Sequence, residues 1–282
     1  MELLLAQGVT EPPVLVSPLP PWVWLALFGT TALTSVSLAT YWSITRRDPI
    51  PLLSCIGAAV CALNEPIFDV LGKIVYAENN IMAYSAFGRD IPVFLVIGYI
   101  AWVGLLPYVI ARGMQAGWSA RRLYAVSIAG VTSVWGVEAV NLFIHGWSYY
   151  GDPPLKFFGG VAAMASVPLA AAFLLYALGF TASGWRRCIA GFFVPLFSLP
   201  MMFAGTGWPL YLALHSDLPL IVDYLAIGAL ILLIVVANVA IVRLTVTWRR
   251  SIDSRIDAPV DPAVPMAHHR QDSPTPAGHR LS

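Results

Sequence analysis

The sequence predicts an all-α, polytopic membrane protein: a bundle of seven transmembrane helices, N-terminus outside the cytoplasm and C-terminus inside. Three observations lead to this fold class. The chain of 282 residues is 58% hydrophobic and only 11% charged, whereas soluble globular domains are about 25% charged. Seven stretches are long and apolar enough to cross a bilayer as helices. Arginines follow every second stretch, as expected where loops alternate between the two sides of a membrane.

The predicted spans follow from the length of helix needed to cross the hydrocarbon core, about 20 mostly apolar residues. They lie at 22–44, 50–76, 91–112, 123–145, 157–180, 188–212 and 219–245. This gives three segments: a non-cytoplasmic N-terminal segment at 1–21, a transmembrane domain at 22–245 and a cytoplasmic tail at 246–282. The tail is polar, proline-rich and without periodicity, so we expect it to be disordered.

Loop charges predict the orientation, because cytoplasmic loops of membrane proteins are enriched in Lys and Arg. The loops after spans one, three, five and seven carry most of the arginines: Arg46, Arg47, Arg112, Arg121, Arg122, Arg186, Arg187, Arg243, Arg249, Arg250 and Arg255. The opposite side offers Lys73, Arg89 and Lys156. We therefore expect a multi-pass protein of the cell membrane, with the lipid bilayer as its first partner. Aromatic residues near the span ends fit interfacial belts: Trp22, Trp24, Trp42, Trp118, Trp147, Tyr149, Trp185 and Trp208.

Composition and motifs argue against several function classes. The net charge is +1 and no basic run occurs, so nucleic acid is not an expected partner. The last span has no lysine for a retinal Schiff base. His145 is the one histidine within a span, no DDxxD cluster occurs, and no P-loop or GxGxxG fingerprint is present. The sequence therefore predicts neither a metal nor a cofactor.

Four carboxyl groups within the spans are the candidate functional residues: Glu65, Asp69, Glu138 and Asp223. An acid at mid-membrane costs about 2.5–3.5 kcal/mol on insertion scales, so each one suggests a functional role. With a rise of about 1.5 Å per residue, Glu65 and Glu138 lie roughly 22 Å from the cytoplasmic ends of their helices, and Asp223 about 6 Å from the outer end of its own. All of these depths fall in the outer half of the membrane.

Residues three or four apart share one side of a helix, which groups the polar residues. Glu65 pairs with Asp69, and Glu138 with Asn141 and His145. Pro66 lacks an N–H and should kink its helix, freeing backbone carbonyls. The alternative is structural: these groups can hold helices together, and Asp69 can pair with Lys73 at i,i+4. We treat Asp69 and Asn141 as secondary candidates.

A buried carboxylic acid favours its protonated form and can donate a proton near neutral pH. Four aromatic residues at comparable depth are candidates to line the same cavity: Tyr99, Trp102, Trp135 and Tyr224. Aromatic faces stabilise cations. Ordinary helix packing is the alternative explanation for these rings.

The chain resembles the integral-membrane terpene cyclases of fungal meroterpenoid and indole-diterpene pathways and their bacterial relatives, which cyclise indole-sesquiterpenes. The resemblance rests on seven spans over about residues 22–245, on Glu65 in LNEPIFD and on Asp223 in LIVDYL. It implies a cofactor-free enzyme that protonates a terminal epoxide or alkene of a prenylated, lipophilic substrate and directs cation cyclisation. Glu65 or Asp223 would be the acid, with the other polarising it or assisting the closing deprotonation.

Two other classes remain open. A proton-coupled transporter would also carry acids in its spans, although no inverted repeat or pair of matching broken helices is evident. A ligand-sensing or scaffold protein is the third possibility, but the loops are short and no soluble output domain is present. The sequence favours the enzyme, with Glu65 and Asp223 as its candidate catalytic pair.

Overall fold

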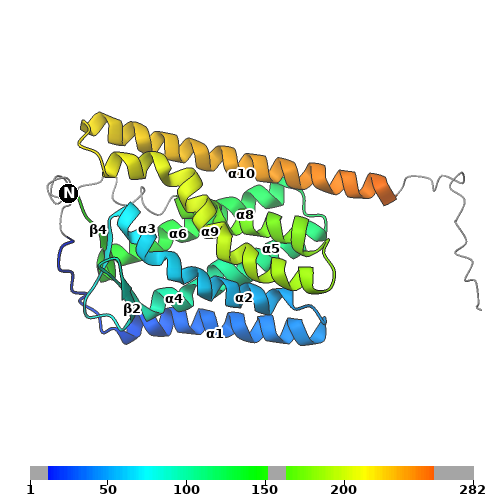
Figure 1. The fold of residues 1–282 in the computed structure, drawn as a ribbon, viewed down its shortest axis with the longest axis horizontal. Coiled ribbons are helices and arrows are strands. Elements are labelled where there is room, and N and C mark those ends of the chain that lie inside the picture. Colours follow the sequence, from blue (N-terminus) through cyan, green and yellow to red (C-terminus); the bar gives the residue numbers. More distant parts are fainter. Residues whose placement is uncertain (1–11, 152–162, 257–282) are drawn as a thin grey trace, which may run out of the picture.

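The computed structural model describes residues 12–151 and 163–256, which form a helical bundle (Figure 1). Its helices are α1 (Trp22–Thr45), α2 (Ile50–Cys61), α3 (Glu65–Gly72), α4 (Val93–Tyr99), α5 (Leu106–Gln115), α6 (Ala120–Ile144), α8 (Val167–Leu174), α9 (Trp185–Leu214) and α10 (Leu220–Ile256). A 3-10 turn, Ala62–Asn64, joins α2 to α3, and a π-helical segment, Ile100–Leu105, joins α4 to α5. A 3-10 turn, Ala163–Ser166, precedes α8, and a π-helical segment, Leu175–Gly179, follows it.

Six helical stretches in the described part of the chain are long and apolar enough to cross a membrane: Trp22–Thr45, Ile50–Gly72, Val93–Gln115, Ala120–Ile144, Trp185–Leu214 and Leu220–Arg250. They confirm the prediction of a multi-pass helical membrane protein. The predicted span at 157–180 begins outside the described residues, and its described part is a shorter apolar helix, Met164–Gly179.

Two small antiparallel sheets lie together at one end of the bundle (Figure 1). β1 (Ile74–Tyr76) pairs with β4 (Trp147–Tyr149), and β2 (Met82–Ala86) pairs with β3 (Arg89–Pro92). In the first sheet Tyr76 lies opposite Trp147, and Ile74 opposite Tyr149. The all-α prediction missed these strands, because each is too short to show a clear alternation of polar and apolar residues.

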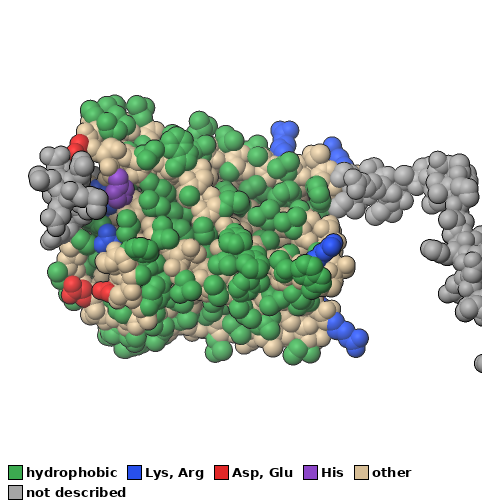
Figure 2. Space-filling view, viewed as in Figure 1, with side chains coloured by type: hydrophobic (Ala, Val, Ile, Leu, Met, Phe, Trp, Pro, Cys, Tyr) green, Lys and Arg blue, Asp and Glu red, His purple; other side chains and the backbone are tan. Residues whose placement is uncertain are grey.

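Basic residues gather at the other end, beyond an apolar band (Figure 2). Contacts between distant segments define that end: Arg187 bonds Asp48, Arg249 donates to the Trp118 carbonyl at 2.9 Å, and Arg112 lies over the Phe180 ring. The loops predicted to be cytoplasmic therefore lie on one side of the bundle.

Some aromatic residues predicted for the interfacial belts are instead part of the core. Trp22, Trp185 and Trp208 are exposed, but Trp24 is 1% exposed and stacks on Phe94. Trp147 also packs against Trp24. The belt prediction is wrong for Trp24 because this ring faces the sheet end of the bundle, where an aromatic cluster covers it.

The last helix is longer than predicted. α10 continues to Ile256, beyond the expected end of the span at 245 and into the segment expected to be disordered. No proline or glycine interrupts the chain between Gly228 and Pro259, so nothing in this part of the sequence breaks the helix. The remainder of the predicted tail and the first part of the N-terminal segment lie outside the described residues.

The pair formed by Arg187 and Asp48 offers a test of this packing. Arg187 donates to both carboxylate oxygens of Asp48, at 3.1 and 3.0 Å, and to the Gly179 carbonyl at 3.2 Å. We expect Arg187→Ala to lower the free energy of unfolding by about 2–3 kcal/mol, because it leaves a buried carboxylate without its charged partner. Thermal unfolding of the protein in detergent measures this. Arg186→Ala, an exposed neighbour, is the control, and equal effects of the two substitutions would contradict the prediction.

Candidate functional site

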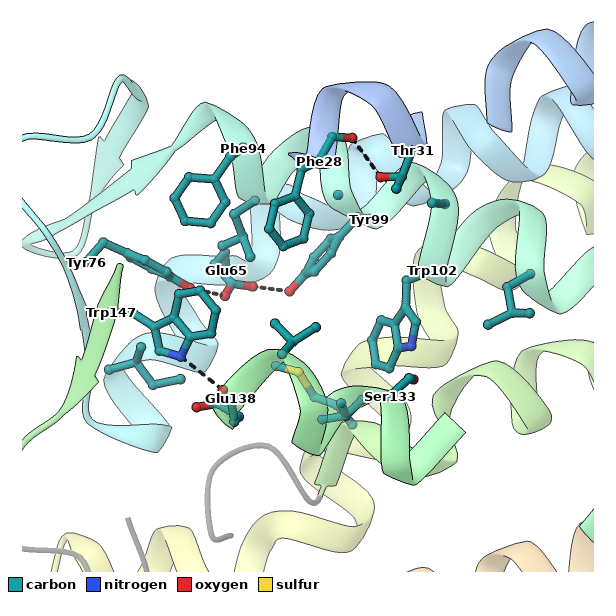
Figure 3. A pocket seen from close by; sticks show the side chains of 18 of the residues that line it. Phe28, Thr31, Glu65, Tyr76, Phe94, Tyr99, Trp102, Ser133, Glu138 and Trp147 are labelled. Atoms are coloured by element: carbon teal, nitrogen blue, oxygen red, sulfur yellow. Dashed lines mark hydrogen bonds between the residues drawn. The ribbon is translucent and has the colours of Figure 1, made fainter. Parts of the chain in front are cut away.

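A cavity of about 460 Å³ lies between α1, α4, α6 and the β1–β4 sheet. Most of its wall is aromatic or aliphatic, and two carboxyl groups, Glu65 and Glu138, belong to it. Figure 3 shows the two acids with the rings around them. The aromatic residues of the lining are Phe28, Tyr76, Phe94, Tyr99, Trp102, Trp147 and Tyr149.

Glu65 lies where the second predicted span changes its helical geometry. Pro66, in the first turn of α3, cannot donate to the Ala62 carbonyl, and the 3-10 turn Ala62–Asn64 precedes Glu65. The Ala62 carbonyl instead accepts hydrogen bonds from the Glu65 N–H and, at 2.6 Å, from the Tyr84 hydroxyl. The predicted effect of Pro66 on the backbone is confirmed, with the freed carbonyl bonded to a tyrosine.

Two tyrosine hydroxyls hold the Glu65 side chain, which is 1% exposed. Tyr76 donates to Oε1 at 2.7 Å, and Tyr99 donates to Oε2 (Figure 3). Both oxygens of Glu65 are therefore hydrogen-bonded. A hydroxyl can donate to a carboxylate or accept from a carboxylic acid, so these partners suit either protonation state of Glu65.

Glu138, on α6, has a different pair of partners. Trp147 Nε1 and the Tyr149 hydroxyl both donate to its Oε1, each at 3.0 Å. The indole N–H can only donate, so this contact favours the ionised form of Glu138. The side chain is 5% exposed, and the hydrogen bonds offset part of the cost of its burial.

The β1–β4 sheet connects the two acids. Tyr76 on β1 bonds Glu65, and Trp147 directly opposite on β4 bonds Glu138. Side chains two residues apart point to the same face of a strand, and Ile74, Tyr76, Trp147 and Tyr149 all line the cavity. One face of this sheet therefore forms a wall of the cavity and positions the hydrogen-bond donors to both acids.

The tyrosines of this sheet stay protonated. Burial, together with the nearby charges of Asp69 and Glu65, raises the pKa of Tyr76 well above its ordinary value. Burial and the Glu138 charge raise the pKa of Tyr149 in the same way. Both hydroxyls therefore remain hydrogen-bond donors over the whole physiological pH range.

Asn141 orders the turn between α6 and β4. Its Oδ1 accepts from the backbone N–H groups of Gly146 at 2.8 Å and Trp147 at 3.1 Å, and its Nδ2 donates to the Trp147 carbonyl at 2.9 Å. Asn141 does not line the cavity. The structure thus places this predicted site residue behind Trp147, where it positions the ring that bonds Glu138.

The other predicted residues divide into two groups. Tyr99 and Trp102 line the cavity, and Trp102 comes from the π-helical segment. Asp223, Tyr224 and Trp135 do not line it; Asp223 lies in the first turn of α10, and Tyr224 is 49% exposed. The predicted meeting of Glu65 and Asp223 in one cavity is therefore absent from the described structure, because no residue of α10 belongs to the lining of this pocket. Glu138 occupies the second acidic position.

Asp69 is fully buried but lies outside the cavity lining. Neither of its oxygens forms a well-aligned hydrogen bond among the described residues, and the Tyr76 hydroxyl and Arg89 are the nearby groups that act on it. The alternative of an i,i+4 pair with Lys73 is not realised, because α3 ends at Gly72 and Lys73 adopts a left-handed conformation with φ 51°.

The cavity opens between α1 and α6. Thr31 on α1 and Ser133 and Val137 on α6 belong to its lining and are exposed. This opening lies on a side of the bundle formed by apolar helices, the side that a bilayer would cover. A lipophilic molecule could enter here without crossing water.

Sequence reasoning missed Tyr76, Trp147 and Tyr149 as site residues. The signal available in the sequence was the position of these aromatic residues, each next to a span that carries an acid. The pairing of segments 74–76 and 147–149, however, depends on the tertiary fold. Within residues 12–151 and 163–256 no three His, Cys, Asp or Glu side chains group as a metal site would require. The site that is present can exchange protons with an apolar ligand.

Comparison of the chain with models of protein families, with curated proteins and with solved structures finds no match. The resemblance to membrane terpene cyclases therefore stays a prediction from Glu65, Asp223 and the spans. The geometry of the cavity is what favours a function for this chain.

Replacement of Asn141 tests how the second acid is positioned. We expect Asn141→Ala to lower the free energy of unfolding by about 2–4 kcal/mol, because two buried backbone N–H groups lose their acceptor. Thermal unfolding in detergent measures the loss. Thr132→Ala on the same helix removes an exposed hydroxyl that bonds the Ile128 carbonyl, and it should change stability by less than about 0.5 kcal/mol. If both variants unfold together, Asn141 does not order the turn.

Proposed function

We propose that this chain is a membrane-embedded, metal-independent terpene cyclase. It would protonate a terminal epoxide or alkene of a prenylated, lipophilic substrate and guide the cyclisation of the resulting cation. The observation that carries the proposal is a single aromatic-lined cavity that holds two buried carboxyl groups from different helices, Glu65 and Glu138. Such a cavity combines a proton donor, a proton acceptor and an apolar surface.

The hydrogen-bond partners suggest a role for each acid. Glu65 is held by hydroxyls, which can accept from the protonated acid, so it is the proposed general acid. Glu138 also accepts from a hydroxyl, that of Tyr149, but its second donor is an indole N–H, which cannot accept from a protonated acid, so Glu138 is the proposed base. In this scheme the Glu65 O–H bond breaks as the proton joins the substrate, an internal alkene closes the ring, and Glu138 removes a proton from the final cation. The product is an isomer of the substrate.

The rings around the acids fit the intermediate. Aromatic faces attract cations within about 6 Å of the ring centre, and the cavity contains the rings of Phe28, Phe94 and Trp102. These groups stabilise positive charge without acting as nucleophiles. The largely apolar wall also limits the water that could capture a carbocation.

The proposal includes a topology. We infer that the segment ending in Met164–Gly179 is a seventh span and that the arginine-rich end faces the cytoplasm, as loop charge favours. The cavity then lies toward the outer side of the membrane. Substrate would enter from the bilayer through the opening between α1 and α6.

The test uses membranes that contain the full chain, incubated with prenylated phenols, indoles and their terminal epoxides, with and without EDTA. Mass spectrometry and chromatography detect an isomeric, cyclised product. Glu65→Gln and Glu138→Gln keep the size of each side chain but remove its proton chemistry, and we expect each to reduce product formation by about 100-fold or more. Full product yield in both variants would refute the assigned roles.

Asp223→Asn is the matched control, because it changes an acid of a membrane helix that does not line the cavity. We expect it to keep wild-type yield. Loss of product in Asp223→Asn with normal yield in Glu138→Gln would instead favour the pair implied by the family resemblance. Substrate-coupled proton uptake into vesicles that is lost in Glu65→Gln and Glu138→Gln, without any new product, would favour a transporter.

A further inference from the structure

A second cavity lies beside the first. Its volume is about 270 Å³, and residues of α5, α6, α8 and the turn before α8 line it. Leu106 and Ser133 belong to the lining of both cavities. These two side chains therefore form a common wall of the two spaces.

One face of α6 runs along both cavities. Val126 and Gly130 line the second, Ser133 lines both, and Val137 and Glu138 line the first. The first four of these positions follow the i, i+4, i+7, i+11 spacing of a single helix face, and Glu138 comes directly after the last of them. At about 1.5 Å per residue, the path from Val126 to Glu138 is on the order of 18 Å long. This is much longer than a compact ring system requires.

The second cavity offers an apolar surface. None of its described lining residues is ionisable. Its hydroxyl groups are bonded within the protein: Ser127 donates to Asn238 Oδ1 at 2.8 Å, and Ser133 donates to the Gly130 carbonyl at 2.7 Å. Asn238 in turn donates to Ser166 at 2.9 Å. The site thus suits a hydrocarbon chain better than a polar headgroup.

We propose that the two cavities form one binding site for a substrate with a long isoprenoid tail. The terminal alkene or epoxide that reacts lies between Glu65 and Glu138, and the rest of the isoprenoid chain, toward its substituted end, follows α6 past Ser133 into the second cavity. The assignment of the reacting end rests on the proposed function, whereas the tail site rests on the common wall of the two cavities and on their apolar lining. The second cavity therefore selects substrates by chain length.

Two glycines on α6 provide a matched test. A Cβ at Gly130 would meet just the Ala165 carbonyl oxygen, at 3.9 Å, so a side chain there has room to extend into the second cavity. A Cβ at Gly136 would meet nothing within 4 Å, and Gly136 is exposed on another face of the helix. Gly130→Leu should therefore block the tail site, while Gly136→Leu adds the same side chain to the same helix without doing so.

The experiment uses the full chain in detergent and photoreactive analogues of geraniol, farnesol and geranylgeraniol with a diazirine in place of the hydroxyl group, at the end of the chain opposite the terminal alkene. Cross-linked positions are mapped by mass spectrometry. We expect the geranylgeranyl probe to label residues near Val126 and Leu169, and the geranyl probe to label residues near Val137. Gly130→Leu should reduce labelling at the distal positions about tenfold or more, because the added side chain takes the place of several methylene groups. Labelling by the geranyl probe should stay at the wild-type level, and Gly136→Leu should leave both patterns unchanged.

Each other result overturns the proposal. Distal labelling that persists in Gly130→Leu shows that the tail lies elsewhere, and equal losses for long and short probes show that the cavity does not select chain length. Absence of distal labelling in the wild-type protein shows that the site is closed or filled by a bilayer lipid. If Gly130→Leu does not fold, Ala129→Phe at the exposed rim of the same cavity replaces it. Labelling requires no turnover, so failure of the cyclase assay and failure of the tail site are separate results.

Discussion

The arrangement of the cavity depends on the antiparallel pairing of β1 with β4. This pairing places Tyr76 opposite Trp147, and these two residues bond the two acids. Backbone hydrogen bonds extend it at both ends, from Tyr150 to the Lys73 carbonyl at 3.0 Å and from Ala77 to the Gly146 carbonyl at 2.9 Å. A shift of register by one residue would turn every side chain of a strand to the other face. Because the sheet joins the ends of α3 and α6, it also fixes where Glu65 and Glu138 lie relative to each other.

Departures from regular α-helix supply the rest of the geometry. A proline and a 3-10 turn direct Glu65 toward the cavity, and a π-helical segment carries Trp102 just after Tyr99. Segments of 3-10 or π-helix inside an α-helix are frequent at functional sites, because they change the direction of a side chain without ending the helix. In an apolar bundle they need local partners for the displaced carbonyls. Tyr84 provides one for Ala62, which ties the β2–β3 hairpin to the helix that carries Glu65.

Sequence patterns predicted the features that depend on residues close together in the chain. Apolar length predicted the membrane helices, the missing N–H of Pro66 predicted the distorted backbone, and buried charge singled out Glu65 and Glu138. The hydrogen-bond partners of those acids could not be predicted from the sequence. Trp147 and Tyr149 lie next to a span end, and aromatic residues at that position are also typical of an interfacial belt. Asp223, in contrast, is predicted as a site residue but does not line the cavity. Its predicted depth in the membrane falls in the same half as that of Glu65, but depth does not define which side of a helix faces its neighbours. That depends on how α10 packs against α6 and α9.

The hydrogen-bond donors to the two acids explain how one cavity can be both acidic and apolar. Glu65 and Glu138 are held by aromatic side chains, each with a single polar atom at the edge of a large ring. That atom offsets the cost of burying a carboxyl group, while the ring contributes apolar surface to the wall. Aliphatic donors such as serine would satisfy the acids but would leave more room for water beside them. Asp69, one turn beyond Glu65, forms no well-aligned hydrogen bond among the described residues, although the Tyr76 hydroxyl lies close enough to act on it, and it does not line the cavity. Tyr76 thus bonds the acid that lines the cavity and leaves the acid enclosed by the fold without a well-aligned hydrogen bond.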